Sequence, residues 1–165
     1  MTTLDHIASR MVEFYAGDPG SIQHFIKVHG FAALIGRLEG VDPHTQFVLE
    51  AAAYVHDIGA KPAMDKYGSA AGPYQEELGP LPAGELLRAS GVEETDIERV
   101  AYLVGHHHTY DHIDGIDYQI LVEADFLVNL FEGKQSLDGI RKTYDKIFKT
   151  AAGRRLCSVM FGLSA

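Results

Sequence analysis

The stretch YVHDIG at positions 54–59 places His56 directly before Asp57 at the end of an alanine-rich, apolar segment. Imidazole nitrogens and carboxylate oxygens are ligands of divalent metal ions. Neighbouring side chains on a helix point about 100° apart, so these two share one ion most readily near a helix end. We expect the helix to stop at Gly59. The alternative is a histidine that favours the helix dipole beside an aspartate that caps the following loop.

Two further residues of metal-binding type stand on apolar helix faces. His24 shares a face with Val28, and Asp125 shares one with Leu121 and Val128. A lone histidine in such a position is normally a hydrogen-bonded core residue. A buried carboxylate is costly unless it meets a cation or a metal ion, so Asp125 requires a partner.

Helical patterns cover the segments that carry the first three of these residues. Residues 21–40 begin with Ser21, a predicted N-cap, and place apolar residues at helical spacing. Residues 41–59 contain Asp42 followed by Pro43, which is typical of an N-cap and a first helical position. Both segments predict buried helices.

Three more helices are predicted from apolar residues three and four positions apart. They cover residues 95–108, 116–131 and 136–149. The first of them opens with Thr95 and Glu98 at capping-box spacing. No convincing pair of alternating strands is present, so the expected fold class is all-α.

Glycine and proline concentrate between residues 59 and 84, which predicts a long loop with at most one short helix. Loops of this length in compact domains are usually functional or disordered, and this one directly follows the His-Asp pair. Tyr67 and Tyr74 within it, and Tyr110 further on, could stack on a nucleobase. Packing on the surface of the core is the commoner role of such tyrosines.

Composition limits the classes of protein. The 165 residues are 46% apolar, which suffices for one domain with a substantial core. The start of the chain is charged and no run reaches the length of a membrane span, so we expect a cytoplasmic protein without a membrane partner. The net charge of −9 argues against binding of duplex nucleic acid. Cys157 is the only cysteine, so a metal must be held by His, Asp or Glu.

The order and spacing of these residues resemble the HD-domain superfamily of metal-dependent phosphohydrolases. The matching features are His24 followed by Val28 and Ala32, then HDIG at 56–59, then EAD at 123–125. The resemblance extends from residue 20 to about residue 132. We expect residues 1–165 to form one domain, with C-terminal helices over 136–162.

The resemblance implies that His24, His56, Asp57 and Asp125 bind one divalent cation within an irregular helical bundle. Two nitrogen and two oxygen ligands suit Mn, Fe, Co, Ni, Zn or Mg and leave positions open for water and substrate. Such an ion polarises a phosphoryl oxygen and provides hydroxide near neutral pH. The expected activity is therefore hydrolysis of a small phosphate ester, with a nucleotide as the candidate substrate.

Basic side chains near the motif are candidates for binding phosphate. Lys61 is placed to stabilise charge on the phosphoryl oxygens, and a solvated loop lysine is the alternative. Many HD domains carry a lysine directly after the motif glycine, whereas Ala60 intervenes here. Lys149, Arg154 and Arg155 could also reach a phosphate, although a solvated helix face is the commoner role of such a cluster.

His106, His107 and His108 crowd one helix end. In HD domains with two metals, histidines at this end and in the segment after the His-Asp motif complete the second site. Residues 75–87 contain no histidine, which argues against a complete second site even though Glu76 or Glu77 could substitute. We therefore assign His107 and His108 to substrate binding or proton transfer, and His106 to a helix cap.

Two other functions remain open. A metal-stabilised ligand-binding or regulatory module would keep the ligands without turnover. An HD-type oxygenase would require a site with two irons, which this set of ligands does not support.

Overall fold

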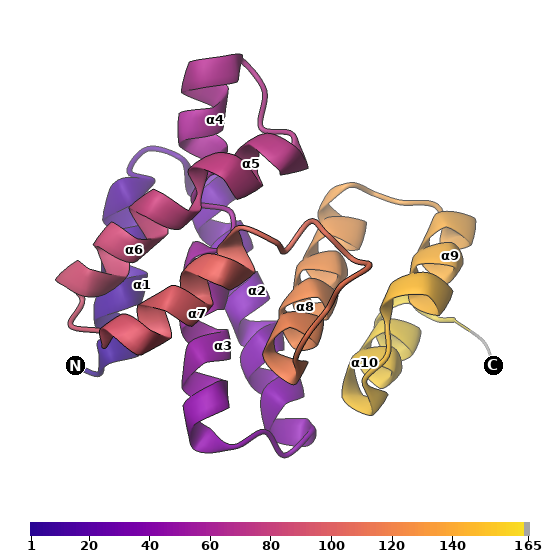
Figure 1. The fold of residues 1–165 in the computed structure, drawn as a ribbon. Coiled ribbons are helices and arrows are strands. Elements are labelled where there is room, and N and C mark those ends of the chain that lie inside the picture. The colour runs from indigo at the N-terminus through magenta and orange to yellow at the C-terminus, as the bar shows by residue number, and fades with distance from the viewer. Residues whose placement is uncertain (164–165) are drawn as a thin grey trace.

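The computed structural model describes residues 1–163, and this part of the chain folds into ten α-helices without a β-strand (Figure 1). The predicted all-α fold class is confirmed. The helices are α1 (Thr3–Phe14), α2 (Pro19–Leu38), α3 (Pro43–Val55), α4 (Ala60–Tyr67), α5 (Gly72–Leu78), α6 (Pro80–Ala89), α7 (Glu94–Val104), α8 (Ile116–Glu132), α9 (Leu137–Ile147) and α10 (Ala151–Phe161).

Helices α2, α3 and α8 form the centre of the bundle, and each packs against the other two. α3 buries Ala51, Ala52 and Ala53, whose small side chains let neighbouring helices approach closely. α8 is apolar on nearly all sides and buries 11 of its residues, including Asp125. Asp125 therefore lies in the interior of the bundle.

The remaining helices cover the central three from opposite sides (Figure 1). α1 and α7 pack against α3, and α6 packs against both of them. α10 packs against α2 and α8, and α9 packs against α8 and α10. None of the described helices is long and apolar enough to cross a membrane.

Residues 59–84 are mostly helical, so the prediction of a long loop was wrong. α4, α5 and the start of α6 occupy this segment, with Pro62, Pro73 and Pro80 in their first turns. Proline is tolerated there because the amides of a first turn have no intrahelical partner. Gly59 and Gly79 bracket α4 and α5 with their backbones in contact: a Cβ on Gly59 would lie 2.8 Å from the Gly79 nitrogen.

The caps of α2 and α3 differ in how well the sequence predicts them. Asp42 caps α3 as expected, and its carboxylate accepts hydrogen bonds from two backbone N–H groups. α2 begins earlier than predicted because Asp18, and not Ser21, is its N-cap. The Asp18 carboxylate accepts from both the backbone N–H and the hydroxyl of Ser21.

α7 also begins earlier than predicted. Its first residue is Glu94 and its N-cap is Glu93, so the pair Thr95 and Glu98 does not form a capping box at the helix start. The preceding turn explains this: Gly91 has a positive φ of 81°, which ends α6 tightly and returns the chain to helical geometry within three residues.

Candidate metal centre

Four side chains from three helices converge in the centre of the bundle. His24 belongs to α2, His56 is the C-cap of α3 with Asp57 next to it, and Asp125 belongs to α8. His24 Nε2 lies 3.3 Å from Asp57 Oδ2 and 3.2 Å from Asp125 Oδ1. His56 Nε2 lies 3.5 and 3.4 Å from the same two oxygens. All four atoms lie within 4.8 Å of one another, which is the convergence expected from the sequence.

The hydrogen bonds behind the two imidazoles determine what they present to the centre. His56 Nδ1 lies 2.9 Å from the carbonyl oxygen of Ala53, which only accepts, so this nitrogen carries a proton. His24 Nδ1 lies 3.3 Å from a carboxylate oxygen of Glu132 and is fixed in the same way. In their neutral forms both Nε2 atoms therefore present lone pairs, and they lie 3.2 Å from each other.

Two imidazole nitrogens and two carboxylate oxygens that meet in a buried site form a donor set that suits a divalent cation. Bonds of about 2.1 Å to one ion place neighbouring ligand atoms about 3.0–3.4 Å apart. The separations in the cluster, 3.2 to 3.5 Å, are of this size. The donor set and its spacing thus fit one divalent metal ion.

Burial and charge at the cluster act in opposite directions. Burial lowers the pKa of His24, but its contacts with Asp125 and Asp57 outweigh burial and raise that pKa to about 10. Burial raises the pKa of Asp125, yet the facing imidazoles of His24 and His56 hold it well below its usual value. The surroundings of the cluster therefore favour a positive charge at its centre.

Outer contacts fix the metal-ligating groups in place. Asn129 donates a hydrogen bond of 2.8 Å to Asp125 Oδ1. Glu132 contacts His24 and also forms an ion pair of 2.7 Å with Lys27. Such partners orient metal ligands and raise their basicity. Sequence analysis missed both, although Asn129 and Glu132 follow Asp125 by four and seven residues and so share its helix face.

Asp57 presents its second oxygen to the histidine triplet. Its Oδ1 lies 2.9 Å from His107 Nε2 and 3.6 Å from His108 Nε2. His107 Nδ1 bonds the carbonyl oxygen of Val104, three residues earlier, as His56 Nδ1 bonds that of Ala53. Asp57, His107 and His108 form a second group whose ligand atoms lie close enough to hold a cation.

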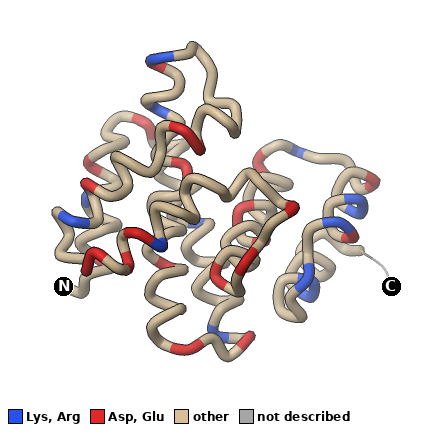
Figure 2. Tube along the Cα trace, in the orientation of Figure 1, with Lys and Arg blue, Asp and Glu red and all other residues tan. Residues whose placement is uncertain are grey.

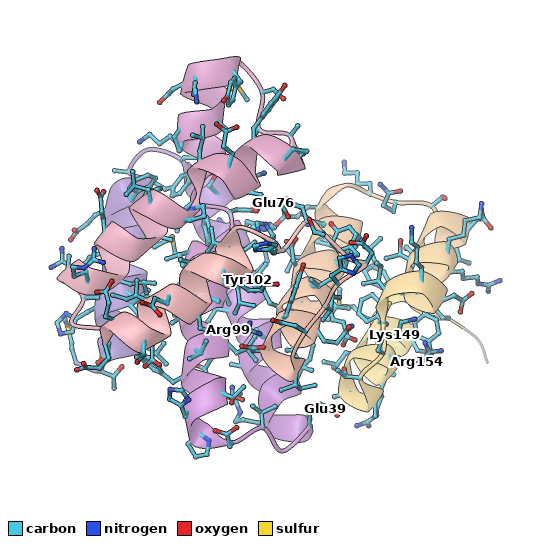
Figure 3. All side chains as sticks on the ribbon, viewed as in Figure 1. Glu39, Glu76, Arg99, Tyr102, Lys149 and Arg154 are labelled. Atoms are coloured by element: carbon cyan, nitrogen blue, oxygen red, sulfur yellow. The ribbon has the colours of Figure 1, made fainter. Side chains whose placement is uncertain are left out.

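α5 holds the backbone of His108. Glu76 accepts hydrogen bonds from the His108 backbone N–H at 2.9 Å and from the Thr109 hydroxyl at 3.0 Å. Figure 3 labels Glu76 beside the loop that follows α7. A Cβ on Gly72 would lie 3.0 Å from the His108 ring, so a glycine there lets α5 pack directly on the imidazole. Glu76 thus supports a histidine.

Comparison with protein families gives one match: the model of the HD domain matches residues 21–142. The chain belongs to the HD domain family. Comparisons with curated proteins and with solved structures give no match. The recognition made from His24, the HDIG segment and Asp125 is therefore confirmed, and the family is one of metal-dependent phosphohydrolases.

Two adjoining cavities lead to the cluster of the HD domain. The inner cavity has a volume of about 260 Å³ and is lined by Gly20, Phe25, Asn129, Glu132, the ligands His24 and Asp57, and the three residues that both cavities share. The outer cavity, about 480 Å³, lies between the α1–α2 turn and α4. Tyr15, Ser21 and Ala60 line both cavities. The Tyr15 hydroxyl also donates to the Asp57 carbonyl oxygen at 3.1 Å, which ties the shared wall to the metal-binding segment.

Lys61 lines the outer cavity and not the inner one. Its amine donates a hydrogen bond of 3.1 Å to the carbonyl oxygen of Phe14 and lies 5.3 Å from the centre of the Phe14 ring. A direct role on a phosphoryl group would require the side chain to leave these contacts.

The other candidates from the sequence lie elsewhere. Arg154 stacks on Tyr144 at 4.1 Å and bonds the Phe148 carbonyl oxygen, while the Lys149 amine bonds the Asp145 carbonyl oxygen. Figure 3 shows both basic residues beside α9 and α10. Contacts with α9 and with its C-cap residue Phe148 thus occupy both side chains.

The aromatic candidates are also engaged. Tyr67 and Tyr74 lie in α4 and α5, not in loops, and their rings stack on each other at 4.4 Å. Tyr110 packs on Phe126 at 5.3 Å. His106 bonds the carbonyl oxygen of Tyr102 at 2.7 Å, in agreement with a helix-capping role.

Proposed function

We propose that this HD domain is a metal-dependent phosphohydrolase that cleaves a small phosphate ester with water, and that nucleotides are its leading candidate substrates. The observation that carries the proposal is the pair of oxygens on Asp57. One oxygen belongs to the four-atom metal cluster, and the other faces His107 and His108. A single carboxylate thus connects a cation site with groups that bind phosphate or transfer a proton.

His24, His56, Asp57 and Asp125 would hold the ion. A bound divalent ion supplies the positive charge that polarises a phosphoryl oxygen and lowers the pKa of water. Asp57 orients the attacking water through its carboxylate. His107 and His108 donate hydrogen bonds to the phosphoryl oxygens or a proton to the departing alcohol. The Tyr15 hydroxyl holds the backbone of Asp57 and so keeps the carboxylate in position.

The inner cavity provides room for the phosphoryl group, and the outer cavity provides room for the rest of a small ester. In this proposal Lys61 stabilises the phosphoryl charge after it leaves the carbonyl oxygen of Phe14. Replacement by alanine then leaves the metal bound and lowers kcat about 10²–10³-fold, the loss expected for one charge-stabilising donor.

Elemental analysis of the purified protein, followed by a panel of nucleotides and other phosphate esters with each metal restored, tests the function. We expect metal-dependent release of phosphate that Asp57→Ala abolishes. Glu85→Gln, an exposed change on α6, serves as the matched control and retains activity. Metal occupancy without hydrolysis of any ester in the unmutated protein would favour the ligand-binding or regulatory module.

The histidines are tested by the same assays. His107→Ala and His108→Ala should each reduce turnover while one equivalent of metal stays bound, because the four-atom cluster does not include them. If either variant instead loses an equivalent of metal, the group formed by Asp57, His107 and His108 is a second ion site, and the assignment of these histidines to substrate is wrong.

A further inference from the structure

The outer cavity is large enough for the organic part of an ester, and its wall, unlike that of the inner cavity, contains none of the clustered metal ligands. Asp18 and Asp65 contribute carboxylates to its wall, and Lys61 contributes its only basic side chain. The Lys61 amine is already bonded to the Phe14 carbonyl oxygen. A second anionic group in this cavity would therefore meet two carboxylates, while Lys61 is bonded to Phe14 or, in the proposed function, to the first phosphoryl group.

The start of α2 does not offset this charge. The N-terminus of a helix usually attracts anions through its free N–H groups. Here the Asp18 carboxylate takes both the backbone N–H and the hydroxyl of Ser21. These bonds lower the pKa of Asp18, so the group that occupies the helix start is itself negatively charged.

The net negative charge of the molecule is concentrated in residues 1–133, which carry the site. Residues 1–133 carry 21 acidic and 7 basic side chains, whereas residues 134–165 carry 2 acidic and 7 basic ones. Figure 2 shows the basic residues of the second group along α9 and α10. The α4–α5 side, where the outer cavity lies, gains no basic residues from this cluster.

We propose that the two cavities select monophosphate esters of an uncharged, hydroxyl-bearing alcohol and reject di- and triphosphates. A metal ion held by the cluster, of which His24 and Asp57 line the inner cavity, would bind one phosphoryl group there. A second phosphate would extend towards Asp18 and Asp65, where like charges repel it. Sugar hydroxyls suit the same wall, because carboxylates and the Ser21 hydroxyl accept their hydrogen bonds. This inference rests on the proposed function, since it concerns the substrate of the same site.

Pairs of substrates that share one nucleoside and differ only in phosphate number test the selection. We expect kcat/KM for the monophosphate to exceed that for the diphosphate by at least about tenfold. Asp65→Lys should reduce this preference about tenfold, because it replaces a repulsive charge with an attractive one. Glu85→Lys makes the same change of net charge on α6, in a separate cavity with Arg10 and Glu13, and should leave the preference unchanged.

Measurements of nucleotide binding test this inference independently of the proposed function. Titration calorimetry on the metal-loaded protein, with metal content checked afterwards, gives the Kd for each nucleotide without any need for turnover. A protein that hydrolyses no ester but binds the monophosphate more tightly disproves the proposed function and supports the selection. Equal or tighter binding of the diphosphate, or equal effects of Asp65→Lys and Glu85→Lys on the preference, would overturn it.

Discussion

Glu123 and Asp125 are buried carboxylates two residues apart on α8, and their surroundings have opposite chemistry. Glu123 accepts hydrogen bonds from the backbone N–H groups of Lys149 and Thr150 and from the side chain of Gln119. Asp125 receives one such bond from an uncharged donor, Asn129, and otherwise faces imidazole nitrogens. The first carboxylate is satisfied by the protein alone, while the second lies in a cluster that could hold a cation.

The difference separates a structural carboxylate from a candidate metal ligand. Glu123 joins α8 to the start of α10, where Thr150 is the N-cap. A Cβ on Gly153 would overlap the Glu123 carboxylate, so the glycine within α10 is needed for this contact. The motif EAD thus contains two acids with unrelated roles, and the number of donors around each one distinguishes them.

The largest effect is expected from Asp125→Ala. Loss of an outer partner of a metal ligand costs about 10–100-fold in affinity, so loss of a ligand itself should weaken metal binding by more than about 100-fold. Elemental analysis and metal titration measure the change, and far-ultraviolet circular dichroism checks that the helices remain. Undiminished metal binding would show that Asp125 belongs to a polar core network.

Glu123→Ala should affect folding and not metal binding. It leaves the backbone N–H groups of Lys149 and Thr150 without their partner, at a cost of about 1–3 kcal/mol each. We expect the free energy of unfolding, from urea denaturation, to fall by roughly 2–6 kcal/mol. Metal content should stay equal to that of the unmutated protein. A loss of metal in this variant would contradict the separation of the two acids.

Addition of metal should stabilise the fold, because the ion would bind to the cluster that contains Asp125. At a free metal concentration 100 times its Kd, the gain is about 2.7 kcal/mol, which corresponds to a rise in Tm of roughly 5–11 °C for a chain of this size. Differential scanning calorimetry with chelator and with Mn, Ni, Zn or Fe measures it. The rise should persist in Glu123→Ala and vanish in Asp125→Ala.

The smallest effect is expected from Glu132→Gln, which weakens the contact that orients His24. Metal affinity should fall about tenfold, the lower end of the range for outer partners. Lys27→Gln is the matched control, because it removes only the ion pair of Glu132 and leaves His24 in contact with the carboxylate. Equal losses in both variants would assign the effect to surface charge and not to His24.

The sequence predicted the metal cluster better than it predicted the surrounding helices. His24 and Asp125 stood out as polar residues on apolar helix faces, and the resemblance to the HD-domain superfamily joined them with His56 and Asp57 in one ligand set. Asn129 and Glu132 continue the same face, and a search at spacings of four and seven from Asp125 would have found them. The convergence of α2, α3 and α8 depends on tertiary packing, which spacing along the chain does not contain.

The structure of residues 59–84 was mispredicted because glycine and proline occur in two different structural contexts. They interrupt regular structure within an element, but they also stand at the starts and ends of short helices. Pro62, Pro73 and Pro80 occupy first turns, where no hydrogen bond is lost. The roles of Glu76 and Glu123 were equally hidden, since their donors lie 32 and 26 residues away along the chain.

The contact between Gly59 and Gly79 has a consequence for protein engineering. Because the two ends of α4 and α5 meet backbone to backbone, residues 60–78 leave the bundle and return to it at nearly one point. A segment with adjoining ends can be exchanged for another of different length without moving the helices that it connects. The segment 60–78 carries Lys61 and Asp65 but none of the four clustered ligands. Grafted segments that keep Gly72 and Glu76, which hold His108 in place, could therefore give this scaffold new substrate preferences over an unchanged cluster.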